Sequence, residues 1–281
     1  MKTTVFLGGG RITGALLAGL RLAEYPGPLM VYDRHPEKLR RLQKLYGVTT
    51  ERSLERAVAQ ADLLVIAVRP VSVSGLLQQI RPVSRPLIAV SLAAGVPLSF
   101  LRRRLRPPVH WGRAMPSPAC RSGRGLTALA FARGFPDPAK RQIRNLFARV
   151  GPVLEISEKK FDAFTVTYSC SHGYHALSTL AAAAERLGLN RKTALMAAAH
   201  ALADGIAAWR EGDISLDALL HEAATPGGIA ASVMDSMNRA GYKKVVERGL
   251  AAGLSLARKN AARAQASAAN RFANRKSRIP R

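Results

Sequence analysis

The chain has 281 residues, of which 48% are apolar, and it carries a net charge of +25. This length and apolar content fit one or two domains with buried cores and exclude a disordered chain. No apolar run reaches the roughly 18 residues that a membrane helix needs, and no secretion signal precedes the first expected strand. The two cysteines, Cys120 and Cys170, provide neither a disulfide framework nor metal-ligand spacing, so we expect a cytoplasmic protein without a metal site.

The start of the chain predicts a strand, a glycine turn and a helix. An apolar strand at 3–7 runs into Gly8-Gly9-Gly10-Arg11-Ile12-Thr13-Gly14, and a helix is expected over 12–23. Gly8 permits a tight turn, and Gly10 lets the backbone approach a pyrophosphate, which the first N–H groups of the helix would then face. This order of elements predicts a dinucleotide-binding loop.

The next expected strand, 29–32, ends in Asp33 and Arg34, where the adenosine ribose of a dinucleotide should lie. Asp33 favours NAD, because its carboxylate would accept the ribose hydroxyls and repel a 2′-phosphate. Arg34 and Arg11 favour NADP, because arginine suits bidentate phosphate recognition and two charges at about 4 Å interact by roughly 4 kcal/mol at an effective dielectric near 20. Two cations outweigh one anion, so we expect NADP, with NAD as the alternative.

Strands and helices continue to alternate as far as residue 157. The expected strand 62–68 is almost wholly apolar, which is typical of a parallel sheet covered by helices on both faces. Further strands are expected at 48–49, 87–92, 109–115, 126–132 and 153–156, and further helices at 36–45, 53–59, 71–80 and 138–150. Residues 1–157 are therefore predicted to form one doubly wound α/β domain of the Rossmann type.

From about residue 158 the sequence becomes rich in alanine and helical in pattern. Helices are expected at 174–187, 191–209 and 216–223, followed by a helical region at 229–256 that is broken near Gly241. Alanine-rich faces permit close packing, and so many helices with few polar positions suggest that surface is buried against a partner. Residues 158–258 are therefore predicted to form an all-α dimerisation domain, in a homodimer or a higher oligomer of dimers.

The positive charge is concentrated in two parts of the chain. Residues 256–281 contain eight Lys and Arg residues and no acid, so we expect 259–281 to be a basic, disordered tail. A second excess lies between Arg102 and Arg133, among expected helices and turns. No zinc-finger spacing, aromatic ribonucleoprotein motif or helix-turn-helix accompanies these charges, so nucleic acid is not an expected partner. A solvated surface is expected for the second group, with a polyanion or phosphate role as the alternative.

Eight motifs in chain order resemble those of the pyrroline-5-carboxylate reductase family over residues 3–258. Besides the glycine loop, they are Ala67–Pro70, Val90–Val96, Arg113–Pro116, Gly123–Leu129, Asp162–Thr165, Gly188–Arg191 and Thr225–Gly228. This resemblance implies a Rossmann cofactor domain, a helical dimerisation domain, and hydride transfer from NAD(P)H to the C=N carbon of 1-pyrroline-5-carboxylate, which gives L-proline. It also implies a substrate cleft between the nicotinamide and the second domain, shared by two subunits.

The resemblance implies two sets of site residues. The expected cofactor-binding residues are Leu7, Gly8, Gly9, Gly10, Arg11, Ile12, Asp33, Arg34, Ala67, Val68, Arg69, Pro70, Leu92, Ala93, Ala94, Met115 and Pro116. The expected catalytic and substrate-binding residues are Tyr174, His172, Thr225, Gly227 and Gly228. Tyr174 stands where the family has its tyrosine, His172 is a candidate proton donor to an imine nitrogen, and the turn at 225–228 offers N–H groups to a carboxylate. Packing roles for the tyrosine and the histidine stay open.

Three segments depart from the family pattern. Its Ser-Gly-Ser-Gly-Pro-Ala-Tyr segment is Tyr-Ser-Cys-Ser-His-Gly-Tyr at 168–174, and the two threonines after its Pro-Gly-Gly are Ile229 and Ala230. Its Met-Pro-Asn-Thr-Pro-Ala segment is Met-Pro-Ser-Pro-Ala-Cys at 115–120. Two alternatives therefore stay open beside the implied activity: reduction of another small cyclic imine, or a catalytically inactive dinucleotide-binding sensor with a basic interaction tail.

Overall fold

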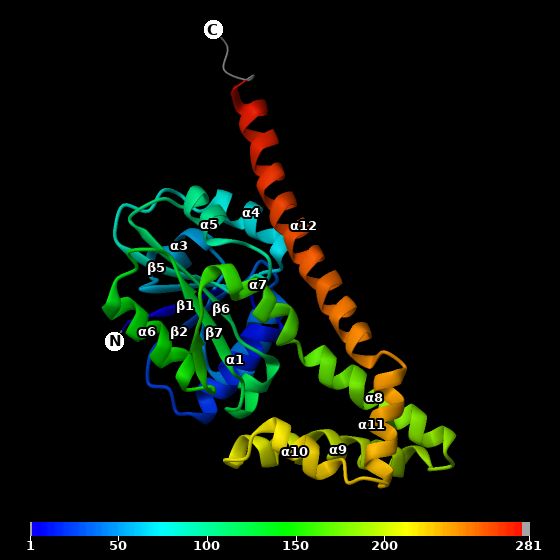
Figure 1. The fold of residues 1–281 in the computed structure, drawn as a ribbon. Coiled ribbons are helices and arrows are strands. Elements are labelled where there is room, and N and C mark those ends of the chain that lie inside the picture. The colour runs from blue at the N-terminus through cyan, green and yellow to red at the C-terminus, as the bar shows by residue number, and fades with distance from the viewer. Residues whose placement is uncertain (1, 277–281) are drawn as a thin grey trace. The chain divides into compact units, whose positions relative to one another are not determined.

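The computed structural model of the chain describes residues 2–276, apart from the side chains of Cys170 and of residues 263–276. Two compact units are present: the first comprises Met1–Thr167 together with Gly253–Arg281, and the second comprises Tyr168–Ala252. The first unit holds an eight-stranded sheet with helices on both faces, and the second is helical (Figure 1). The predicted organisation, a Rossmann-type sheet followed by an all-α region, is confirmed.

The sheet contains a point at which the strand order reverses. Its strands are β1 (Thr4–Leu7), β2 (Leu29–Tyr32), β3 (Thr49–Glu51), β4 (Leu63–Ile66), β5 (Leu87–Ser91), β6 (Val109–Met115), β7 (Thr127–Phe131) and β8 (Val153–Glu155). The order across the sheet is β3-β2-β1-β4-β5-β6-β7-β8, so the chain builds outwards from β1 on one side and from β4 on the other. The strands from β1 to β6 are parallel, and their carboxyl ends therefore share one edge.

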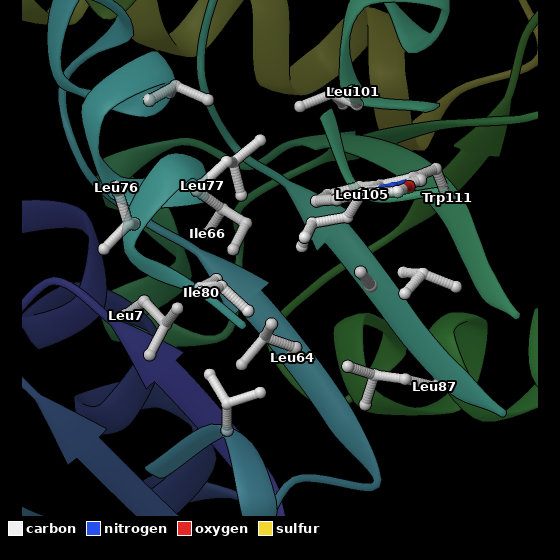
Figure 2. Packing of buried hydrophobic residues seen from close by; sticks show 14 of the residues in the cluster. Leu7, Leu64, Ile66, Leu76, Leu77, Ile80, Leu87, Leu101, Leu105 and Trp111 are labelled. Carbon is white, nitrogen blue, oxygen red and sulfur yellow. The ribbon is translucent and has the colours of Figure 1, made fainter. Parts of the chain in front are cut away.

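Helices cover both faces of this sheet. One face carries α3 (Leu54–Ala59), α4 (Pro70–Gln79) and α5 (Leu98–Arg104), and the other carries α1 (Arg11–Leu22), α2 (Pro36–Tyr46) and α6 (Asp137–Ala148). Side chains alternate between the faces of a strand, so Val5 and Leu7 join the first core whereas Phe6 joins the second. Figure 2 shows the first core, where Ile66 of β4 lies near Leu77 of α4 and Leu64 of β4 lies near Ile80.

Strand β7 is antiparallel to β6, a reversal that the sequence pattern did not predict. The connection between these strands contains the short 3₁₀ helix η1 (Pro118–Ser122) instead of a crossover helix, and a parallel return would need such a crossover. The η1 segment packs against α1, where a Cβ added to Gly19 would lie 2.0 Å from the Cys120 carbonyl oxygen. Gly19 is therefore required for the close approach of these two segments.

Helix α7 (Glu158–Thr167) belongs to the first unit, although the sequence pattern predicted a domain boundary between residues 157 and 158. Phe161 of this helix is fully buried against Ala128 and Ala130 of β7, with Met115 packed beside them. Because this contact fastens α7 to the sheet, the division between the units falls after Thr167.

A charged turn fixes the short helix α3. The Glu51 carboxylate accepts hydrogen bonds from the backbone N–H groups of Arg52 and Ser53, each at 2.7 Å, and from the Arg56 guanidinium at 2.9 Å. The hydrogen bond from Arg56, aided by those from the backbone, lowers the pKa of Glu51 to about 2. The stability that ionised Glu51 contributes is therefore fully present above the ordinary carboxyl pKa, and it is lost as the pH falls through about 2.

The second unit consists of α8 (Cys170–Arg186), α9 (Arg191–Glu211), α10 (Leu216–Ala223) and α11 (Ile229–Arg239). Helices α8 and α9 pack together, and among the described residues of this unit only Ala181, Ala194 and Ala198 are buried. Helix α8 begins earlier than the predicted residue 174, so most of the segment 168–174 is the first turn of a helix and not a loop. No helix in the described part of the chain is long and apolar enough to cross a membrane.

Helix α12 (Tyr242–Lys276) follows the predicted break at Gly241, and it continues well beyond the predicted domain end at 258. Residues 259–276 are therefore helical where a disordered tail was expected, because this alanine-rich stretch has high helix propensity and no proline. Residues 277–281 lie outside the described residues. The backbone of Ala257 lies against Gly95, which has φ +70° and would bring an added Cβ within 2.9 Å of the Ala257 carbonyl oxygen.

Two truncations should separate the docked part of α12 from the rest. Removing everything after Asn260 retains the contact of Ala257 with Gly95, so we expect the melting temperature to change by no more than a few degrees. Removing everything after Ala252 deletes that contact, and we expect a loss of at least roughly 5 °C. Thermal denaturation of the two truncated proteins beside the full chain tests this, and an equal loss in both would show that the segment beyond Asn260 also stabilises the fold.

Candidate cofactor-binding site

The topology singles out one edge of the sheet. In open α/β sheets, ligands bind outside the carboxyl ends of the strands, at the point where the strand order reverses. In the first unit this point lies between β1 and β4. A cavity of about 630 Å³ lies there, lined by Gly8, Gly10, Arg11, Tyr32, Asp33, Arg34, His35, Lys38, Ala67, Val68, Arg69, Ser72, Gly75, Leu76 and Gln79.

Gly8 makes the turn that leaves β1. Its φ of +117° is one that side-chain-bearing residues rarely adopt, and an added Cβ would lie 2.8 Å from the Ala67 carbonyl oxygen. The Gly8 carbonyl also accepts a hydrogen bond from the Thr13 hydroxyl, which closes the loop onto the first turn of α1. The loop is therefore fixed from inside, by β4 on one side and by α1 on the other.

Gly10 presents the open side of the same loop. A Cβ added at Gly10 would meet no atom within 4 Å, so the space above this backbone is free for a ligand. Gly10 is the N-cap residue of α1 and has no capping side chain. The first N–H groups of a helix have no partner within the helix, so this end of α1 offers them, with the positive end of the helix dipole, to an anion. The loop therefore fits a pyrophosphate.

Asp33 lines the cavity and also holds the loop at Gly9 in place. Its side chain is 8% exposed; Oδ2 accepts the Gly9 N–H at 2.8 Å and Oδ1 accepts the His35 N–H at 2.9 Å. The Lys38 ammonium lies 3.5 Å from Oδ2 and offsets its charge. Both carboxylate oxygens thus bind the backbone of the protein and the carboxylate charge is partly offset, which weakens the repulsion of a 2′-phosphate by Asp33.

Cations gather at this end of the cavity. Arg11, Arg34 and Lys38 all line it, and all three are exposed, together with the half-buried His35. The Arg34 Nε lies 3.3 Å from the His35 Nε2, which connects these two side chains. Sequence reasoning found the two arginines but missed the other two residues. The signal available was the first turn of α2, which starts directly after β2 and turns Lys38 back toward the same edge.

One face of α4 forms the opposite wall of the cavity. Arg69, Ser72 and Gln79, together with Gly75 and Leu76, recur at the three- and four-residue spacing of a helix face. Only Arg69 was predicted from the sequence, because the resemblance to the family ended at Pro70. Helical periodicity counted onward from Arg69 would have located the rest.

The remaining predicted cofactor residues lie outside the lining of this cavity, and most of them have structural positions nearby. Leu7 is fully buried, the Gly9 N–H donates to Asp33, and Ala93 is part of the core. The others are Ile12 in the first turn of α1, Pro70 at the start of α4, Leu92 and Ala94 after β5, and Met115 and Pro116 at the end of β6. Leu92 and Ala94 thus follow the carboxyl end of β5, and Met115 is the last residue of β6, at the same edge of the sheet.

The predicted catalytic residues all lie in the second unit. His172 and Tyr174 are in the first turns of α8, and both are exposed, with Tyr174 at 68%. The turn before α11 contains Thr225 and Gly227, which are exposed, and it ends at Gly228, the N-cap of that helix. No side chain caps α11, and the Gly228 N–H donates to the Thr225 carbonyl at 2.8 Å. The first N–H groups of α11 are therefore available to an anion such as a carboxylate.

Fold and cavity together define a dinucleotide-binding protein with an additional helical unit. The family profile described as "NADP oxidoreductase coenzyme F420-dependent" matches residues 3–95, and the profile described as "pyrroline-5-carboxylate reductase dimerisation" matches residues 158–260. The pyrroline-5-carboxylate reductase of Mycobacterium leprae is 31% identical over 273 residues, which cover 88% of this chain and 92% of that protein. The chain belongs to the pyrroline-5-carboxylate reductase family.

Two further similarities agree with this membership. The pyrroline-5-carboxylate reductase of Thermus thermophilus is 38% identical over 208 residues, covering 70% of this chain and 76% of that protein. The crystal structure of the Plasmodium falciparum pyrroline carboxylate reductase with NADP bound has a TM-score of 0.83 at 21% identity, covering 92% of this chain and 98% of that chain. The second similarity shows a shared fold.

Proposed function

We propose that the protein reduces the C=N bond of 1-pyrroline-5-carboxylate to give L-proline, with NADPH as the hydride donor. The observation that carries this proposal is a glycine loop flanked by the cations of Arg11, Arg34 and Lys38 in a member of the pyrroline-5-carboxylate reductase family. When bound, NADPH supplies the hydride that is added to the ring carbon. The protein then has to hold both reactants in line and keep the imine nitrogen protonated. Turnover of this imine by the purified chain with NADPH is the direct test.

The residues of the first unit favour NADPH over NADH. Gly10 and the first N–H groups of α1 would hold the pyrophosphate, and Arg34 with Lys38 would hold the 2′-phosphate. Charged hydrogen bonds to phosphate are stronger than neutral ones, and Asp33 is already bound by the Gly9 and His35 N–H groups, with Lys38 beside its charge. The relative from Plasmodium falciparum was crystallised with NADP, which supports the same choice.

The nicotinamide half should extend away from these cations. A dinucleotide lies across the reversal point of the sheet, so its second half passes from β1 toward the carboxyl ends of the following strands. Those ends carry Leu92 and Ala94 after β5, and Met115 with Pro116 at β6. We therefore assign these residues to the nicotinamide end of the site. This explains why they lie outside the cavity, whose lining includes the cations that would bind the adenosine half.

The second unit supplies candidates for binding the acid of the substrate. The N-terminus of α11 offers N–H groups from a helix of 11 residues. Tyr174 and His172 offer a hydroxyl and an imidazole from the start of α8, where the Ser169 and Ser171 hydroxyls lie 2.7 Å apart. The altered composition of this first turn is the observation that favours a second candidate function, the reduction of a different small cyclic imine.

Restoring the family's hydroxyls at α11 should improve turnover. Ile229 is 87% exposed and Ala230 is exposed, so threonine at both positions has room and introduces no burial problem. One added hydrogen bond to a charged group contributes about 1.5–3 kcal/mol, so we expect Ile229→Thr with Ala230→Thr to raise kcat/KM for 1-pyrroline-5-carboxylate by roughly tenfold or more. Steady-state kinetics decides this. Slower turnover in the double variant would mean that the chain binds the acid through other groups.

We expect the protein to be a homodimer, or a higher oligomer of dimers, through the second unit. Large apolar side chains are exposed there, among them Leu187 at 87%, Met196 at 58% and Ile206 at 56%. A surface of this kind needs a covering partner, and the matched dimerisation profile over 158–260 supports a second copy of the chain. Light scattering should give at least twice the monomer mass of 30.2 kDa. A stable monomer at micromolar concentration would contradict this expectation.

The cytoplasmic location stays a prediction.

A further inference from the structure

Among the residues of the first unit whose side chains the structure describes, Arg113 is the most deeply buried cation, with 1% of its side chain exposed. Its guanidinium donates to Glu158 Oε1 at 3.1 Å and to Asp162 Oδ1 at 2.7 Å, and both carboxylates belong to α7. The guanidinium also lies 4.2 Å from the centre of the Phe161 ring on the same helix. Strand β6 is therefore joined to α7 through one side chain that makes three contacts.

The same cluster reaches a third element. Glu158 Oε1, which accepts from Arg113, also accepts the backbone N–H of Leu98 at 3.0 Å. Leu98 is the first residue of α5, which follows the loop leaving β5. At the other end of that loop, Ser91 is the register partner of Arg113 in the sheet, and its hydroxyl accepts the Ala93 N–H at 3.3 Å. The loop at 92–97 is thus held at both ends by residues bound to or paired with Arg113.

These contacts lie where the nicotinamide half of a dinucleotide is expected. The loop at 92–97 contains Leu92 and Ala94, and Met115 follows Arg113 on the same strand. Both segments leave the carboxyl ends of parallel strands, at the edge that carries the Gly10 loop. None of the cluster residues lines the cavity around Gly10, so the cluster acts on this end of the site without touching the adenosine end.

Stability alone explains the cluster poorly. Arg113 Nε and Glu158 Oε2 are buried and have no hydrogen-bond partner in the described part of the chain. The Arg113 side chain is buried, whereas the Glu158 and Asp162 side chains are 31% and 27% exposed. Removing the guanidinium from water is costly, solvent weakens its attraction to half-exposed carboxylates, and unpaired buried polar atoms reduce the net stabilisation further. What such a pair does provide is a fixed geometry, because the planar guanidinium binds its carboxylates in only a few orientations.

We propose that the cluster of Arg113, Glu158 and Asp162 positions the nicotinamide end of the cofactor by fixing the loop at 92–97 and the end of β6. The three are positioning residues, since they act through Leu92, Ala94 and Met115. The inference rests on the proposed function only for the placement of the dinucleotide. It predicts that weakening the cluster affects the nicotinamide half of the ligand and spares the adenosine half.

Two ligands separate these halves: NADPH, and 2′,5′-ADP, which contains the adenosine and its phosphates but no nicotinamide. In Glu158→Gln and Asp162→Asn we expect NADPH to bind roughly tenfold more weakly, 2′,5′-ADP to bind within about twofold of wild type, and kcat to fall roughly tenfold or more. Arg113→Lys keeps the positive charge but loses the planar guanidinium that binds two carboxylates at once, so it should have the same effect. Glu155→Gln is the matched control, because it removes a carboxylate from the exposed pair with Arg144 and should change none of these values.

The outcomes distinguish a positioning role from a merely structural one. Equal weakening of both ligands, accompanied by a lower melting temperature, would overturn the inference, and so would variants that bind both ligands like wild type. The glutamine and asparagine variants keep the volume and one oxygen of each carboxylate, so the test stands even if Arg113→Lys does not fold. A selective loss of NADPH in a protein that reduces no imine would uphold the inference and refute the proposed function.

Discussion

Replacing Arg34 with alanine should weaken NADPH binding by roughly ten- to a hundredfold, the value of a charged hydrogen bond of about 1.5–3 kcal/mol. NADH binding should change by no more than about twofold, because NADH has no 2′-phosphate for this guanidinium to meet. Arg34 is exposed and lines the cavity beside Lys38, so its removal leaves the loop at Gly8–Gly10 and the Asp33 contacts intact. Calorimetric titration of both dinucleotides measures the difference.

The matched control for this experiment is Arg40→Ala. Arg40 is exposed on α2, the helix that follows Arg34, but does not line the cavity, so its removal changes the net charge equally without changing the site. NADPH affinity within about twofold of wild type is expected there at moderate salt. Equal losses in Arg34→Ala and Arg40→Ala would mean that only long-range charge attracts the cofactor. Unchanged affinity in both would place the 2′-phosphate elsewhere.

Replacing Gly10 with alanine should abolish dinucleotide binding while leaving the fold intact. The new Cβ meets no protein atom within 4 Å, and the φ of −81° at Gly10 suits alanine, so the loss of a good N-cap residue should cost about 1 kcal/mol or less. The same Cβ occupies the space in which a pyrophosphate would approach the backbone. We expect NADPH and NADH to bind at least roughly a hundredfold more weakly, with the melting temperature within a few degrees of wild type.

Gly14→Ala provides the control for this change. Gly14 lies in α1, the helix that Gly10 caps, and does not line the cavity; its added Cβ would make an ordinary contact of 3.8 Å with Leu42. Alanine has the higher helix propensity, so this variant should be as stable as wild type or slightly more stable, and it should bind both dinucleotides normally. Normal binding in Gly10→Ala would show that the pyrophosphate does not lie over this loop. Poor binding in Gly14→Ala would show that the whole helix start is sensitive to substitution.

Local patterns predicted the first unit well. Glycines that permit a tight turn, apolar strands and alternating elements depend on neighbouring residues, so β1, α1 and the strands up to β6 lie close to their predicted positions. The antiparallel direction of β7 was not predictable in this way, since it depends on η1 packing against Gly19 of α1, a contact distant in sequence. The helical structure of α12 beyond residue 258 was not predicted, because the positive charge and low complexity of this segment were given more weight than its helix propensity.

The candidate site was predicted only in part, because local sequence motifs locate the residues within them but not those on neighbouring helical turns. Residues in the loops that leave β1, β2 and β4 follow from motif spacing, and eight of the predicted residues do line the cavity. Lys38 and Gln79 were missed because they enter from the next turns of α2 and α4, outside the motifs. Asp33 lines the cavity as predicted, and its hydrogen bonds to the Gly9 and His35 backbone could not be predicted because they depend on the three-dimensional path of the loop.

The most direct test of the proposed function is turnover of 1-pyrroline-5-carboxylate by the purified full chain. NADPH oxidation is followed by its loss of absorbance while proline is quantified in the same sample, with a panel of other small cyclic imines alongside. We expect one proline formed for each NADPH consumed, with NADPH preferred over NADH. Tight NADPH binding without consumption on any imine would contradict the proposal and indicate a sensor, and faster turnover of another imine would identify that compound as the substrate.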